Sequence, residues 1–263
     1  WLALHHYEKA IQVDPYTLDG YLAFGNLLKD NKLYDKAMRV YLKGLAIFPT
    51  NPLLYGSLAG LYFEQGLVDL SIDTYKHALL LLPNYPDAYC NLANAYKEKG
   101  LVKEAEQFYN VAINLCPTHA DSYNNLANIY REQGKIKESL ELYRKALEIN
   151  PHFSAAHSNI ATVLQQCGNL IEAVFHYQRA VNSNPANPEC HCFLGNALKE
   201  VGNYKGAVEC YLRAIQLNPS SPETHAFLGT AYKESGSIVE GIQAFKISLK
   251  FRPDFNEVYC NLI

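Results

Sequence analysis

The chain has 263 residues, with 23 Lys and Arg against 26 Asp and Glu and a net charge of −3. This balance excludes the broad basic surface expected of a nucleic-acid-binding protein. No run of 18 apolar residues occurs, so we expect no membrane-spanning helix. The seven cysteines have no CxxC spacing, and no Asn-x-Ser/Thr acceptor is present, so we expect reduced thiols and a location in the nucleus and cytoplasm.

A period of 34 residues runs through the whole sequence. It is marked by prolines at 15, 49, 83, 117, 151, 185, 219 and 253 and by glycines at 66, 100, 134, 168, 202 and 236. Such a period predicts helix–turn–helix repeats stacked side by side. We expect a half repeat, seven full repeats and the start of another, at 1–17, 18–51, 52–85, 86–119, 120–153, 154–187, 188–221, 222–255 and 256–263. Because the sequence opens at Trp1 and ends within a helical pattern, we expect it to be a segment of a longer protein.

The repeat 86–119 shows the pattern within each unit. Its first half places Tyr89, Leu92 and Tyr96 on one apolar helix face. Gly100 is predicted to end this first helix, because glycine accepts the left-handed conformation. Tyr109 is predicted to fill the core of the second helix, which ends before Pro117. Small residues beside the tyrosine would let the two helices approach closely.

These slots resemble the tetratricopeptide repeat: an aromatic, Leu-Gly/Ala, Tyr, Gly, Ala, Tyr/Phe, Ala and Pro at fixed places. The resemblance covers the whole chain and implies an all-α fold, a right-handed superhelical solenoid. Two kinds of departure occur. Lys32 replaces the turn glycine of its repeat, and Gly44 and Ser248 replace the late alanine.

Most of the reactive-looking residues are predicted to have packing roles. Sixteen of the 20 tyrosines fall in core slots, at 7, 21, 41, 55, 62, 75, 89, 96, 109, 123, 130, 143, 177, 211, 232 and 259. His157, His191 and His225 stand in a slot that other repeats fill with tyrosine. They lie on successive helices, too far apart to share one metal ion. We find no catalytic constellation and expect no cofactor and no metal.

A series of asparagines recurs without an evident packing reason. Asn91, Asn125, Asn159 and Asn261 occupy one slot, and Asn94 and Asn128 lie three residues after two of them. The i, i+3 relation puts both sets on one face of the first helix. An amide offers donors and an acceptor, which match the backbone of an extended peptide. The alternative is that these side chains bond between neighbouring helices and stabilise the stack.

An acidic series precedes the same slot, and it includes Asp87 and Asp121. A carboxylate in the first turn of a helix complements the helix dipole, which is a sufficient structural reason for the series. The sharper hypothesis is that these residues also select basic side chains on a bound peptide.

Longer segments resemble the repeat domain of the protein O-GlcNAc transferase family, above all LCPTHADSYNNLANIYREQG and AAHSNIATVLQQCG, and also WLALHHYEKA and RPDFNEVYCNLI. The resemblance implies recruitment of protein substrates and adaptor proteins, as extended peptides, to a glycosyltransferase domain. That domain is not part of this sequence, so we expect no transferase activity here. The resemblance maps a concave asparagine ladder onto Asn91, Asn125, Asn159 and Asn261. Phe193 and Phe227 interrupt the ladder, and a homodimer contact maps onto Trp1 and Leu4.

Two other classes of protein were weighed. A scaffold or co-chaperone unrelated to glycosylation has the same repeats, but the co-chaperone type needs a lysine clamp for a terminal carboxylate. The clamp slot here holds no lysine: Leu22, Gly56, Cys90, Asn124, Ser158, Cys192, Ala226 and Cys260. A self-contained enzyme would require a catalytic site, and the sequence offers none.

Overall fold

Helices joined by short turns make up the described chain. The computed structural model describes residues 2–262, and no strand occurs among them. The chain divides into two compact units, 1–129 and 130–263, with the boundary inside α8 (Ala120–Glu132). The first unit holds α1 (Leu2–Val13), α2 (Leu18–Asp30), α3 (Tyr34–Ile47), α4 (Pro52–Glu64), α5 (Val68–Leu81) and α6 (Pro86–Glu98), followed by α7 (Val102–Leu115). The second holds α9 (Ile136–Ile149), α10 (Ser154–Gln166), α11 (Leu170–Ser183), α12 (Pro188–Glu200), α13 (Tyr204–Leu217), α14 (Pro222–Glu234), α15 (Ile238–Phe251) and α16 (Asn256–Leu262).

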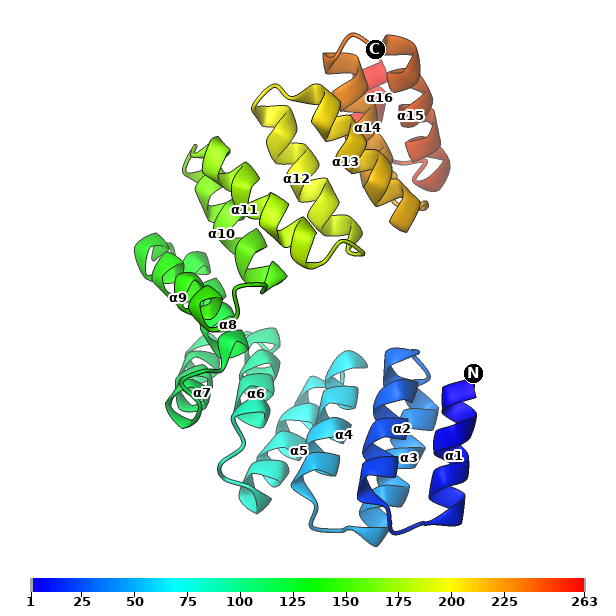
Figure 1. The fold of residues 1–263 in the computed structure, drawn as a ribbon, viewed down its shortest axis with the longest axis vertical. Coiled ribbons are helices and arrows are strands. Elements are labelled where there is room, and N and C mark those ends of the chain that lie inside the picture. Colours follow the sequence, from blue (N-terminus) through cyan, green and yellow to red (C-terminus); the bar gives the residue numbers. More distant parts are fainter. Residues whose placement is uncertain (1, 263) are drawn as a thin grey trace. The chain divides into compact units, whose positions relative to one another are not determined.

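Helices pair in the same way within each unit (Figure 1). In the first unit α2 packs on α3, α4 on α5 and α6 on α7. In the second unit α10 packs on α11, α12 on α13 and α14 on α15. The first helix of a pair also contacts the first helix of the next, as α4 does α6 and α12 does α14. Each unit is therefore a stack of helix–turn–helix repeats, as the 34-residue period predicts. Among the described helices of both units, none is long and apolar enough to cross a membrane.

The turn inside each repeat is closed by a residue in the left-handed conformation. At Gly100 φ is +81°, and the Gly100 N–H donates to the carbonyl of Lys97 at 2.9 Å. The next N–H, that of Leu101, donates to the carbonyl of Tyr96 at 2.9 Å. These two bonds form a Schellman motif, which satisfies carbonyls at the end of the first helix. The prediction that Gly100 ends this helix is confirmed.

Lys32 occupies the same turn position with φ +59°, which a side chain with a Cβ adopts at a cost. Replacing Lys32 with glycine is expected to raise the free energy of unfolding by about 0.5–1 kcal/mol, after allowance for the greater entropy of glycine in the unfolded chain. Chemical denaturation measures the change. The reciprocal Gly100→Lys should lower stability, and a loss of stability in Lys32→Gly would show that the turn is not strained.

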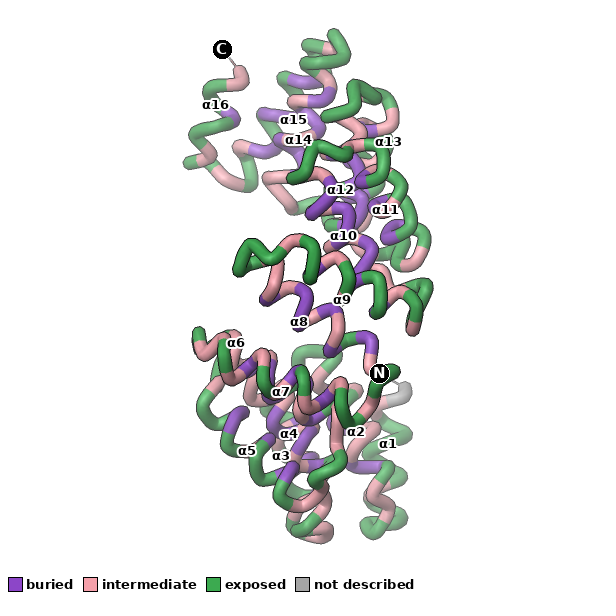
Figure 2. The backbone as a smooth tube through the Cα atoms, turned by 90° about the vertical axis from the view of Figure 1, so that its left-hand side faces the viewer, coloured by how far each residue is buried: buried purple, intermediate pink, exposed green. Residues whose placement is uncertain are grey.

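Tyrosine rings fill the space between paired helices. The rings of Tyr41, Tyr109, Tyr143, Tyr177 and Tyr211 are buried almost completely. Small residues opposite them allow this: a Cβ added to Gly25 would lie 2.2 Å from Cε1 of Tyr41. Figure 2 shows buried residues along the inner sides of the helices and exposed residues at the turns.

Two tyrosines depart from the predicted core. Tyr7 on α1 is 38% exposed and Tyr259 on α16 is 49% exposed. The packing prediction is wrong for these two rings. Their helices stand at the two ends of the described array, where a repeat has a neighbour on one side instead of two, and a stacked repeat needs both neighbours to cover its core face.

Candidate functional site

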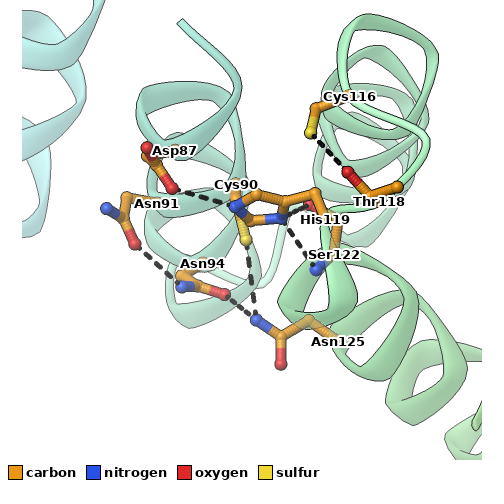
Figure 3. Close-up of polar contacts among 9 residues, drawn as sticks. All are labelled: Asp87, Cys90, Asn91, Asn94, Cys116, Thr118, His119, Ser122 and Asn125. Atoms are coloured by element: carbon orange, nitrogen blue, oxygen red, sulfur yellow. Dashed lines mark hydrogen bonds and ion pairs between the residues drawn. The ribbon is translucent and has the colours of Figure 1, made fainter. Parts of the chain in front are cut away.

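The predicted polar face is best defined on α6 and the start of α8, both in the first unit. Asn91 and Asn94 lie one turn apart on α6, and Asn125 lies on α8. Together with four other residues they line an open pocket of about 240 Å³. The four others are Asp87, Cys90, His119 and Asp121. The structure thus brings together five of the residues predicted from the sequence, and Figure 3 shows the contacts of four of them, Asp87, Asn91, Asn94 and Asn125.

The three asparagines form a chain of amide hydrogen bonds. Asn125 Nδ2 donates to Asn94 Oδ1 at 3.1 Å, and Asn94 Nδ2 donates to Asn91 Oδ1 at 3.5 Å. The buried hydroxyl of Tyr109 also donates to Asn94 Oδ1. Asn94 is therefore occupied on both its oxygen and its nitrogen by the fold itself, so it positions its neighbours (Figure 3).

The outer ends of this chain remain able to bind a ligand. Asn91 is exposed, and its Nδ2 group donates to no described atom, so both of its N–H groups face solvent. Asn125 Oδ1 accepts one bond, from Asn124 Nδ2 at 3.1 Å, which leaves a second lone pair. Free donors on Asn91 and a free acceptor position on Asn125 thus lie at opposite ends of the chain of amides. An extended peptide presents the complementary groups, carbonyls and N–H groups, along its length.

The second asparagine slot, which holds Asn26, Asn94 and Asn196, was predicted from the sequence to bind peptide. In the structure a tyrosine hydroxyl of the same repeat donates a hydrogen bond to each of these asparagines. The hydroxyls of Tyr41 and Tyr211 donate to Oδ1 of Asn26 and Asn196, each at 2.7 Å. Buried polar groups require such partners. The signal in the sequence is a spacing of 15 residues between the amide and the tyrosine, which joins the two helices of one repeat. Asn94 belongs to this set through Tyr109.

Sequence reasoning missed His119, which links the two helices of the site. Its Nε2–H donates to Asp87 Oδ1 at 2.9 Å, and its Nδ1 accepts the Ser122 N–H at 3.2 Å. His119 thus caps the start of α8, because an early N–H of a helix has no partner within the helix. The residue just before a first helix is often a capping type, such as Asn51 or Ser221, and that position could have identified it.

Asp87, His119 and Ser122 form an acid–imidazole–hydroxyl series like that of hydrolases, with Ser122 Oγ 2.8 Å from His119 Nδ1. A nucleophile must reach its substrate, however, and Ser122 is 0% exposed. Its N–H and its hydroxyl both face the same ring nitrogen. The series therefore holds α6 and α8 together and leaves the Asp87 carboxylate facing solvent.

Cys90 is the other missed residue, and it lies at the floor of the pocket. Burial raises the pKa of the Cys90 thiol to about 11, so it stays protonated at neutral pH. A protonated thiol is a poor nucleophile and a poor metal ligand. Within the described range of residues, no group of three His, Cys, Asp or Glu side chains is placed to hold a metal ion.

The remaining predicted residues are distributed over both units. Asn128 and Asn159 are half-buried and neither is without a partner, and Asp121 is exposed in the first turn of α8. Asn261 accepts a bond from Lys233 Nζ to its backbone carbonyl at 3.0 Å. Of the predicted dimer contact, Trp1 lies outside the described residues. Leu4 packs against the core around Tyr21, so part of its side chain is already covered.

The histidine ladder of the second unit is part of the core. Nε2 of His157, His191 and His225 lies 3.0–3.2 Å from the carbonyl of the proline six residues earlier. The hydroxyl of Tyr55 makes the same bond to Pro49 at 3.2 Å, which explains why either tyrosine or histidine can occupy this slot.

His157 also faces a second histidine, with its Nδ1 3.0 Å from Nδ1 of His176. Because His157 Nε2–H donates to Pro151, neutral His157 accepts through Nδ1 from His176. Burial lowers the pKa of both rings, the positive charge of nearby Arg179 lowers both pKa values further, and His157 also opposes protonation of His176.

The lowered pKa values of His157 and His176 predict a loss of stability in acid. Both rings are neutral in the folded and unfolded states above the unfolded pKa of about 6.5. As the pH falls below that value, the unfolded chain binds protons that the folded pair resists, so the free energy of unfolding decreases. Melting temperatures at pH 7.5 and pH 5.5 measure the loss. His176→Gln keeps a donor without a titrating ring and should lose less, whereas an equal loss would exclude the pair as the cause.

The fold and the site define a helical-repeat protein with a polar face on its first helices. Tetratricopeptide repeat profiles match residues 18–51, 59–100, 86–119, 120–153, 142–175 and 195–236. These ranges cover well over half of the chain, so the chain belongs to the tetratricopeptide repeat family. No curated protein matches it in sequence.

Solved structures share this fold. A chain of the APC/C hetero-tetramer Cut9–Hcn1 aligns with a TM-score of 0.77 at 16% identity, over 98% of this chain and 51% of that one. YrrB, described as a TPR protein with an unusual peptide-binding site, aligns with a TM-score of 0.58 at 20% identity, over 71% and 96%. MamA aligns with a TM-score of 0.55 at 19% identity, over 65% and 94%. The chain thus spans about half the length of the Cut9–Hcn1 chain, and at these identities the likeness shows the fold alone.

Proposed function

We propose that this chain is a protein-interaction scaffold that binds extended segments of partner proteins along the first helices of its repeats. In the first unit the contact residues are Asn91, Asn125 and Asp87. The observation that carries the proposal is the exposed Asn91 amide, whose two N–H groups have no partner in the described part of the chain, together with the free lone pair of Asn125 Oδ1 at the other end of the same chain of amide hydrogen bonds. YrrB, which has the same fold, is described as having a peptide-binding site, and this supports the proposal.

The chemistry favours backbone recognition over side-chain recognition. Asparagine lowers helix stability, because its side chain competes for backbone hydrogen bonds. The hydrogen bonds of Asn94 offset part of that loss, and they hold Asn91 and Asn125 in place, so that the free atoms of these two side chains are fixed before a ligand binds. Groups fixed in advance lose less entropy on binding. Asp87 adds a carboxylate that is 67% exposed and still able to attract a basic side chain.

Peptide chemistry tests this proposal without altering the protein. A labelled ten-residue peptide, TVSTVSTVST, is titrated against the chain and followed by fluorescence anisotropy. We expect binding to weaken by about 0.5–1.5 kcal/mol for each bonded amide that is N-methylated, because the N–H donor is removed. Exchanging Thr, Val and Ser among the positions should change the affinity little. Binding that follows the side chains and ignores N-methylation would refute backbone recognition.

A narrower proposal follows from the sequence segments that resemble O-GlcNAc transferases. We propose that the scaffold recruits protein substrates and adaptor proteins to a glycosyltransferase domain of the same polypeptide, in the nucleus and cytoplasm. The Trp1 and Leu4 pair would then contribute to a homodimer. The segments LCPTHADSYNNLANIYREQG and AAHSNIATVLQQCG support this proposal. The sequence encoded after Ile263 tests it: a glycosyltransferase domain is expected, and another domain or a stop would exclude it in favour of an independent scaffold.

A further inference from the structure

Two phenylalanines replace the asparagine slot on successive first helices of the second unit. Phe193 on α12 and Phe227 on α14 occupy the position that Asn91 and Asn125 have in the first unit. Phe193 is 43% exposed, and Phe227 is half-buried. A phenyl ring cannot donate to or accept from a peptide backbone as an amide does. This part of the second unit therefore requires a different kind of ligand contact.

Both rings are held by tyrosines of the preceding repeat. The centroid of Phe193 lies 6.0 Å from that of Tyr177, and the centroid of Phe227 lies 6.0 Å from that of Tyr211. Separations in this range are favourable for aromatic pairs. Tyr177 and Tyr211 are themselves buried and bonded through their hydroxyls to Thr162 and Asn196. The two phenyl rings thus form a fixed apolar surface that loses little side-chain entropy on binding.

The spacing of the rings limits the shape of the ligand. Residues 193 and 227 are equivalent positions on α12 and α14, which contact each other, and packed helices lie about 8–10 Å apart. A polyproline II segment advances about 3.1 Å per residue with three residues per turn, so side chains at i and i+3 share one side about 9 Å apart. Two apolar side chains at that spacing would meet both rings.

Charge adds a further element of selectivity. Glu189 lies one turn before Phe193 on α12, is exposed, and its carboxylate has no partner among the described residues. The equivalent Glu223, before Phe227, already pairs with Arg252. A cation on the ligand is therefore favoured beside Phe193 and is already supplied by the protein beside Phe227.

From these observations we infer that Phe193 and Phe227 form a subsite for a proline-rich partner segment with apolar side chains at i and i+3 and a basic residue beside the first. The inference rests on the proposed scaffold function and deepens it. The subsite lies within the second unit, and it would add sequence selectivity to the backbone contacts proposed for the scaffold.

Two labelled peptides test the subsite: GSRLPPLPSG, and GSRSPPSPSG with both leucines replaced. We expect the leucine peptide to bind the chain at least about tenfold more tightly, since even partial burial of two leucines exceeds the 1.4 kcal/mol of a tenfold change. The paired variant Phe193→Ala and Phe227→Ala should weaken the leucine peptide about tenfold and leave the serine peptide unchanged. Phe175→Ala is the matched control, because Phe175 is 53% exposed on α11, a second helix, and should have no effect.

Glu189→Gln should weaken GSRLPPLPSG by roughly threefold and should not weaken GSELPPLPSG, because an exposed ion pair contributes little to affinity and only the first peptide carries the cation. Equal affinity of the leucine and serine peptides for the unaltered chain would overturn the subsite, a result that needs no variant to fold. A chain that self-associates through Phe193 and Phe227, seen by sedimentation, would overturn it in favour of a second copy. If TVSTVSTVST still binds in either case, the scaffold proposal stands, and if no peptide binds, the scaffold proposal itself fails.

Discussion

Replacing Tyr109 with alanine is expected to lower the free energy of unfolding by about 3–5 kcal/mol. The ring is 1% exposed between α6 and α7, where Ala93 and Ala105 are fully buried beside it. The surrounding helices cannot close fully over the lost ring, so the cavity adds to the lost burial. The hydroxyl also holds Asn94, so the change should disturb the polar face as well as the core.

Urea or guanidinium denaturation, followed by circular dichroism, measures this loss. Tyr109→Phe separates the two contributions: it keeps the ring and should cost only about 0.5–1.5 kcal/mol for the lost hydrogen bond. Tyr16→Ala is the surface control, since Tyr16 is 78% exposed. A loss below about 1 kcal/mol in Tyr109→Ala would mean that the core slot is not filled as described.

The fold follows from the sequence to an unusual degree, because repetition supplies the same information several times. Glycines equivalent to Gly100 and prolines equivalent to Pro117 recur at 34-residue intervals, so the turns and helix ends could be predicted without knowledge of any contact. The limit shows at Tyr7 and Tyr259. Their slots predict burial, but burial depends on a neighbouring repeat and not on the slot alone.

The site was predicted only in part, for a reason visible at Asn94. Helical spacing places Asn91 and Asn94 on one face, but it cannot show that the Tyr109 hydroxyl, 15 residues later, occupies Asn94. The alternative in which these side chains bond between helices is seen at Asn94, whereas peptide binding through the free Asn91 donors stays a prediction. His119 was missed because it contacts Asp87, which lies 32 residues earlier in the sequence, on another helix.

Replacing Asn91, Asn125 and Asn159 together with alanine is expected to weaken binding of TVSTVSTVST by roughly 1.5–4.5 kcal/mol if the three effects add. Each lost amide–backbone bond contributes about 0.5–1.5 kcal/mol net, so a single replacement would be hard to detect. The structure predicts that Asn91 and Asn125 contribute differently. Asn91 contributes free donors, whereas Asn125 contributes an acceptor and also supports Asn94.

Two control variants distinguish binding from folding in this experiment. Asn26→Ala removes the partner of the Tyr41 hydroxyl, so it should lower stability without changing the affinity at Asn91. Asn110→Ala changes an exposed asparagine on α7, whose side chain donates to the Glu106 carbonyl, and should alter neither property. Circular dichroism confirms that the triple variant is folded. If that folded variant binds the peptide with undiminished affinity, the three asparagines serve the stack alone, and the backbone contacts of a partner must be sought on another face.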